Sequence, residues 1–254
     1  KYPYTASATP KKGKFGFFES EKLCYRQVAE ELGIIEKSPD MFARHPLVYL
    51  MEAADDICYQ IMDIEDAHKL KILDCEEVTS LLTGFFRGQR VERINQVLDA
   101  IDDRNEKVAY LRSCVIGELV GECAKVFVEN EDSILRGEFE GCLIDHISPI
   151  ARQGYSQCSE TAWTKIYNSS EVVYIELAGN QIITFLLDRL LDAVLHPDKN
   201  YSKLLLSRIP NQYDTAAPSV YGKIQAVLDH ISGMTDVYAL DLYRKLNGLS
   251  LPAV

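Results

Sequence analysis

The chain has 254 residues, 47% of them hydrophobic, and a formal net charge of −11 at pH 7. This length fits one large or two small domains with a substantial core, and no apolar run is long enough to span a membrane. The negative charge argues against a protein that coats nucleic acid with its whole surface, but leaves room for a local basic pocket that binds an anionic small molecule.

The seven cysteines include no Cys-x-x-Cys pair, and most fall within helical patterns. They therefore indicate reduced thiols in a cytoplasmic protein. No signal peptide is visible. The chain opens on "KYPYTASATPKKGKFGFF" without a starting methionine, and so reads like the middle of a longer protein.

The first part of the chain predicts a loop followed by two helices. Residues 1–18 combine proline and glycine with several lysines, which is typical of a basic loop. Ser20 precedes a helical pattern that ends at Gly33, a residue suited to a left-handed C-terminal cap. Pro46 favours the first turn of the next helix, which should run to about Leu70.

Further helices are expected wherever apolar residues recur at helical spacing. Their expected ranges are 74–82, 91–101, 106–131, 159–167, 171–195, 202–209, 218–231 and 235–247. We expect a loop near Gly154 and place Trp163 in the core. Strand-like alternation is rare, so the sequence predicts an all-α protein.

The stretch "EAADDICYQIMDIEDA", residues 52–67, places carboxylates in an otherwise apolar helix, where burying an unpaired acid is costly. Asp55, Tyr59 and Asp63 follow at intervals of four residues and share one helix face over roughly 12 Å. An acid for a divalent cation, a flat ring and an acceptor for a sugar hydroxyl are parts of a nucleotide site. Spacing alone nevertheless favours an ordinary surface helix whose acids pair with neighbouring cations. The remaining acids are expected to be solvated or paired with Lys or Arg: Asp56, Glu65 and Asp66.

Four segments resemble, in the right order, the deoxyguanosine triphosphate triphosphohydrolases of the HD superfamily of metal-dependent phosphohydrolases. These segments are "KYPY" with "KKGKFGFF", "RHPLVYLMEAADDICYQIMDIEDA" (44–67), "EVVYIELAGNQII" (171–183) and "ISGMTDVYALDLYRKLNG" (231–248). The resemblance implies that residues 1–254 form the C-terminal portion of a multi-helix, all-α HD-superfamily phosphohydrolase. Its expected parts are a basic pocket loop at 1–18, a metal and sugar-site helix at 46–70 and a helical C-terminal region at 106–254.

The resemblance also implies an activity, the hydrolysis of dGTP or other dNTPs to the deoxynucleoside and inorganic triphosphate. Asp55 matches the last carboxylate ligand of a divalent metal ion, for which Mg²⁺ or Mn²⁺ is expected and iron or nickel is an alternative. Tyr59 matches a tyrosine that packs on the deoxyribose, and Asp63 an acid that accepts its 3′-hydroxyl. The other implied substrate-binding residues are Lys1 at the phosphates, Tyr2 beside it, Glu176 at the guanine edge, and Lys203 toward a neighbouring subunit's site.

The sequence departs from the family in its histidines. The family's first His, its His-Asp pair and its catalytic His/Glu are not matched by the five present, which are His45, His68, His146, His196 and His230. No catalytic residue is therefore assigned in this chain, and an upstream segment is expected to supply them. His45 and His230 are expected to have structural roles, in a helix start and in helix packing.

Two alternatives stay open. One is a non-catalytic nucleotide-binding or oligomer-scaffolding helical protein, and the other is an HD phosphohydrolase with another nucleotide substrate. The resemblance further implies a homo-oligomer, such as a hexamer, and single-stranded DNA as an effector that the lysines of "KKGK" (11–14) could touch. A cytoplasmic location without membrane contact is expected.

Overall fold

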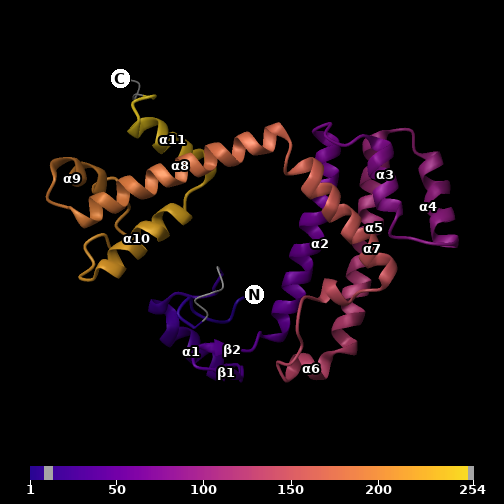
Figure 1. The fold of residues 1–254 in the computed structure, drawn as a ribbon, viewed down its shortest axis with the longest axis horizontal. Coiled ribbons are helices and arrows are strands. Elements are labelled where there is room, and N and C mark those ends of the chain that lie inside the picture. Colours follow the sequence, from indigo (N-terminus) through magenta and orange to yellow (C-terminus); the bar gives the residue numbers. More distant parts are fainter. Residues whose placement is uncertain (9–13, 251–254) are drawn as a thin grey trace. The chain divides into compact units, whose positions relative to one another are not determined.

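The computed structural model describes residues 1–8 and 14–250, and the chain divides into two compact units, 1–168 and 169–254 (Figure 1). The first unit contains a short 3-10 turn (Glu19–Glu21), α1 (Lys22–Glu31), β1 (Glu36–Ser38), β2 (Met41–Phe42), α2 (Pro46–Lys69), α3 (Cys75–Thr83), α4 (Gln89–Ala100), α5 (Arg104–Glu129), α6 (Glu131–Leu135), a second 3-10 turn (Leu143–His146), α7 (Pro149–Thr161) and a π-helical turn (Ala162–Ile166). The second unit contains α8 (Ser170–Leu195), α9 (Asn200–Leu206), α10 (Val220–Ser232) and α11 (Asp236–Leu246). The prediction of an all-α fold is confirmed.

Helix α2 is the central helix of the first unit and begins where the sequence predicts. His45 is its N-cap, with Nδ1 accepting a hydrogen bond from the Leu47 N–H at 3.2 Å, and Pro46 occupies the first helical position. Proline suits that position because its missing N–H would have no partner inside the helix. The structural role expected of His45 is therefore confirmed.

The core of the first unit forms where α2 packs along α5 (Figure 1). Its fully buried side chains recur every three or four residues along both helices, as an amphipathic pattern requires. On α2 they include Ile57, Ile61 and Ile64, and on α5 they include Leu111, Val115 and Leu119. This packing fixes which face of α2 is left for other contacts.

The N-terminal segment forms backbone hydrogen bonds with β2, the strand that precedes α2. Tyr4 forms an isolated antiparallel bridge with Met41, and the Phe42 N–H donates to the Pro3 carbonyl at 2.9 Å. β1 and β2 pair as a two-stranded antiparallel sheet, and Phe17 and Phe42 pack in a small separate core beside it. These contacts bring Lys1 close to α2.

The second unit has its own core between α8 and the helices that follow it. Leu186, Leu190 and Val194 on α8 are buried together with Leu205, Val227 and Ile231. His230 is also buried, with its ring centroid 5.1 Å from that of Tyr213, so the packing role expected of it is confirmed.

Two local predictions are wrong. Gly154 lies inside α7 and not in a loop, because a side chain there would come within 2.8 Å of the buried Phe85 ring, and only glycine permits this close helix packing. Trp163 is 69% exposed and not in the core, because the π-helical turn directs Ala162 and Ile166 inward and leaves Trp163 outside.

Two broader expectations can be compared with the described residues. All seven cysteines are free thiols, as predicted. Across residues 1–8 and 14–250, the structure contains no helix that combines the length and the apolar character needed to cross a membrane.

Candidate nucleotide site

Helix α2 presents the predicted row of polar side chains on the side that the core leaves free. Asp55 and Tyr59 are exposed, Tyr59 by 69%, and Asp63 is half-buried one turn further along. The buried residues of α2 alternate with this row, so the three side chains point away from α5. The exposed ring between two carboxylates is geometrically able to contact a sugar.

Asp63 is held by a residue that the sequence did not suggest. The Tyr167 O–H donates to Asp63 Oδ2 at 2.5 Å, across 104 positions of sequence. Tyr167 directly follows the π-helical turn, and its own N–H donates to the Ala162 carbonyl at 2.9 Å. Nothing in the spacing of either residue could have predicted this long-range contact.

Lys1 lies against α2, one turn before the polar row. Its Nζ is 3.1 Å from Glu52 Oε1 and 3.9 Å from Asp56 Oδ1. Burial lowers the pKa of the Lys1 ammonium, but the hydrogen bond and charge of Glu52, with the charge of Asp56, outweigh it, so that the pKa is raised. Lys1 is therefore a positive charge beside Asp56, the residue that directly follows Asp55.

Glu52 forms an ion pair with a second basic side chain in addition to Lys1. Arg44 Nη1 lies 2.8 Å from Glu52 Oε2, and the Glu52 side chain is only 2% exposed. The Arg44 guanidinium also donates to the Gly141 carbonyl at 2.5 Å and stacks on the Tyr49 ring. Arg44 and Glu52 both lie in the segment that carries the resemblance, but their spacing does not predict that they pair. A buried carboxylate with two cations is stable where an unpaired one would not be.

Tyr2 is kept in place by the glycine of "GKFGFF". The Gly16 N–H donates to the Tyr4 carbonyl at 3.0 Å, and a Cβ on Gly16 would lie 1.7 Å from the Tyr2 carbonyl oxygen. Only a residue without a side chain can fit there. The Lys14 ammonium lies 5.8 Å from the centre of the Tyr2 ring. This explains physically why "KYPY" and "GKFGFF" occur together.

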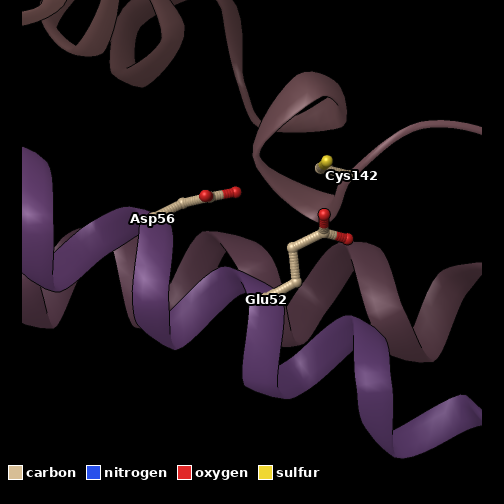
Figure 2. A group of neighbouring side chains, drawn as sticks. All are labelled: Glu52, Asp56 and Cys142. Atoms are coloured by element: carbon tan, nitrogen blue, oxygen red, sulfur yellow. The ribbon is translucent and has the colours of Figure 1, made fainter. Parts of the chain in front are cut away.

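One group of three potential metal-ligand side chains lies within 4.8 Å in the described part of the chain: Glu52, Asp56 and Cys142 (Figure 2). Both carboxylates project from α2 toward Cys142. Burial and the neighbouring Glu52 raise the pKa of the Cys142 thiol to about 11, so it is protonated at neutral pH. Metal binding would need the thiolate and would compete with Lys1 and Arg44 for Glu52. The contacts of Glu52 with Lys1 and Arg44 make this arrangement an ion-pair network.

The other acids of α2, which the sequence predicts to be solvated or paired, have cationic partners. Glu65 is buried and lies 2.6 Å from Arg112 Nη1, and Asp66 lies 3.1 Å from Lys69 Nζ. Asp56 has Lys1 at 3.9 Å, and mainly burial raises the pKa of its carboxyl group.

The remaining predicted residues belong to other parts of the chain. Glu176 on α8 and Lys203 on α9 are both exposed and belong to the second unit. Lys11 and Lys12 of "KKGK" lie outside the described residues. The implied roles of these residues stay predictions.

Comparison with known proteins identifies the family. Residues 146–245 match the model of the phosphohydrolase-associated domain. The whole chain is 32% identical, over 262 residues, to a deoxyguanosinetriphosphate triphosphohydrolase-like protein of Pseudomonas aeruginosa. A protein of the same name from Synechocystis is 34% identical over 94% of the chain. The chain belongs to the deoxyguanosinetriphosphate triphosphohydrolase family of the HD superfamily. It spans 59% of the Pseudomonas relative and 53% of the Synechocystis one.

A more distant relative carries the enzyme's name without qualification. A deoxyguanosinetriphosphate triphosphohydrolase of Yersinia pestis is 26% identical over 96% of this chain, which covers 56% of that protein.

The divalent metal ion implied for Asp55 can be tested against the potential ligand side chains that the structure describes. Asp55 is an exposed carboxylate, suited to a hard cation, but it is not part of any group of three close ligands among the described residues. The described residues thus provide one ligand and not a complete metal site.

Proposed function

We propose that this triphosphohydrolase-family chain forms the sugar-binding part of an enzyme that hydrolyses dGTP, or dNTPs in general, to the deoxynucleoside and inorganic triphosphate. The observation that carries the proposal is the row of Asp55, Tyr59 and Asp63 on the free face of α2. The names of the relatives support the same substrate class.

Each residue of the row has a role that fits its chemistry. The exposed Tyr59 ring offers a flat surface to the deoxyribose, and a 2′-hydroxyl would have to be desolvated against it. Asp63 is an ionisable acceptor for the 3′-hydroxyl, and a site that hydrogen-bonds a hydroxyl discriminates strongly against analogues that lack it. Together they would select a deoxynucleotide with an intact 3′ position.

The basic residues beside the row fit a triphosphate. Lys1 keeps its charge because Glu52 and Asp56 stabilise the ammonium. Tyr2 lies next to it under the Lys14 ammonium. In the proposal Lys1 faces the phosphates and Tyr2 lines the pocket, whereas Arg44 stays committed to Glu52 and Gly141.

The proposal assigns Asp55 to a divalent cation, Mg²⁺ or Mn²⁺ with iron or nickel as alternatives, whose other ligands come from outside this chain's described residues. When bound, such an ion supplies polarisation of a phosphoryl oxygen and activation of a water molecule. The proposal also includes Glu176 at the guanine edge, Lys203 at a neighbouring subunit's site in a homo-oligomer, a DNA effector and a cytoplasmic location.

A non-catalytic nucleotide-binding protein is the second candidate, favoured by the single implied metal ligand among the described residues. Product analysis separates the candidates. The complete polypeptide that carries this chain is incubated with dGTP and Mn²⁺ or Mg²⁺, with and without EDTA, and the products are resolved by ion-exchange chromatography. Metal-dependent release of triphosphate supports the proposal. Binding of dGTP without product supports the second candidate, and phosphate release from another nucleotide supports a related phosphohydrolase.

A further inference from the structure

The hydrogen bond between Tyr167 and Asp63 joins two segments that are far apart in sequence. The phenol oxygen lies 2.5 Å from Asp63 Oδ2, a distance typical of a hydroxyl that donates to a charged carboxylate. Tyr167 is partly exposed, so its hydroxyl group meets Asp63 near the surface of α2 and not inside the core. The contact therefore lies where a ligand of Asp63 would bind.

Tyr167 is held firmly by the turn that precedes it. Ala162 and Ile166, at the two ends of the π-helical turn, are buried in the core of the first unit. Between them, the Lys165 ammonium pairs with Glu77 of α3. A π-helical turn is rare and frequently lies at a functional site. Here it directly precedes the tyrosine whose hydroxyl reaches Asp63 on α2.

The hydrogen bond occupies one oxygen of the Asp63 carboxylate. Among residues 1–8 and 14–250, no second side chain donates to this carboxylate or forms an ion pair with it. Oδ1 is therefore the oxygen left for a ligand. Burial, followed by the bond to Asp63, raises the pKa of the Tyr167 phenol to about 12, so the hydroxyl is a proton donor at neutral pH.

We propose that Tyr167 is a positioning residue that fixes the Asp63 carboxylate, so that Oδ1 accepts the 3′-hydroxyl of the sugar. Without this bond the carboxylate can rotate about its side-chain torsions, and the geometry of the acceptor is lost. Tyr167 thereby sets the preference for nucleotides that carry a 3′-hydroxyl. This inference rests on the proposed function, because it needs Asp63 to face the sugar.

The test compares two substrates in the complete polypeptide. Tyr167→Phe removes one oxygen and keeps the ring, and kcat/KM is measured by triphosphate release from dGTP and from 2′,3′-dideoxyguanosine triphosphate. We expect kcat/KM for dGTP to fall by about tenfold, as for a lost hydrogen bond to a charged group, with the dideoxy substrate unchanged. Asp63→Asn should show the same selectivity. Tyr155→Phe is the matched control, because its hydroxyl donates to the Asp56 carbonyl and not to Asp63.

Each other result has a defined meaning. An equal fall with both substrates, no change with either, or a rise with dGTP would overturn the positioning role. A selective fall in Tyr155→Phe would also overturn it, because loss of any hydroxyl near α2 would then suffice. Absence of triphosphate release by the wild-type polypeptide from any dNTP would instead overturn the proposed function, and this inference with it. Thermal unfolding of each variant confirms that the comparison is made on folded protein.

Discussion

Arg44 and Glu52 form an ion pair of 2.8 Å in which the glutamate side chain is only 2% exposed. Lys1 approaches the other oxygen of the same carboxylate at 3.1 Å. The Arg44 guanidinium also reaches the Gly141 carbonyl, so the pair ties α2 to the N-terminal segment and to the loop before the second 3-10 turn. The network that places Lys1 beside the polar row of α2 is thus built on one buried acid.

Glu52→Gln should destabilise the chain by about 3 kcal/mol, because it leaves the partly buried Arg44 without the counter-charge of Glu52 and leaves Lys1 with only the more distant Asp56. Urea unfolding of the 254-residue chain measures the change. Asp66→Asn on the same helix is the control, since Asp66 is exposed and its partner Lys69 keeps Glu65 as a second carboxylate at 3.4 Å. It should change the free energy of unfolding by less than about 0.5 kcal/mol. Equal effects of the two variants would contradict the network.

Gly154→Ala should destabilise the first unit by about 1 to 3 kcal/mol, because its new Cβ would meet the Phe85 ring at 2.8 Å. Gly117→Ala tests helix propensity alone, because a Cβ there meets nothing within 4 Å. We expect it to stabilise α5 by about 0.5 to 1 kcal/mol. The midpoint of urea unfolding of each variant is compared with that of the wild type. A stabilising Gly154→Ala would show that α7 and Phe85 are further apart than described.

The buried thiol of Cys158 should make the folded chain less stable as the pH rises into the alkaline range. Burial raises its pKa from 9.0 to about 12 in the folded chain. The unfolded chain therefore releases this proton first as the pH rises, and the contribution of the thiol is complete below about pH 9 and is lost progressively above it. The difference in free energy of unfolding between wild type and Cys158→Ala should thus shrink between about pH 9 and pH 11. A difference that grows over this range would have the wrong sign.

Tyr59→Ala should weaken the choice between dNTP and NTP in the complete polypeptide. The ring is 69% exposed, so its loss leaves the core of α2 intact and removes only the surface proposed for the deoxyribose. The ratio of kcat/KM for dGTP to that for GTP should fall by about tenfold. Tyr59→Phe, which keeps the ring, should retain the ratio. Unchanged discrimination in Tyr59→Ala would remove Tyr59 from the sugar site.

The sequence predicted the long helices well because their signals are local. The helix predicted from Pro46 to about Leu70 lies within a residue of the observed bounds of α2. The pairing of Glu52 with Arg44 and that of Asp63 with Tyr167 depend on how the chain folds back on itself, and local spacing contains no such information. Local sequence predicts a loop at Gly154, because the reason for this glycine is the close approach of Phe85, which precedes it by 69 positions.

The exposed row on α2 also could not be distinguished from an ordinary surface by periodicity alone. Helical spacing puts Asp55, Tyr59 and Asp63 on one face, but the same spacing occurs in any helix whose acids pair with lysine or arginine. In the structure, Glu65 and Asp66 have such partners, whereas Asp63 is bound to a tyrosine hydroxyl. The contacts of each carboxylate, and not its position, separate the two groups.

The most direct measurement of the central claim is triphosphate release from dGTP by the complete polypeptide and by its Asp55→Asn variant, in Mn²⁺ or Mg²⁺. Asp66→Asn is the matched control, because it removes one acid of the same helix that already pairs with Lys69. We predict that wild type and Asp66→Asn release triphosphate, and that Asp55→Asn, still folded, releases none. Full turnover by Asp55→Asn would contradict the proposal.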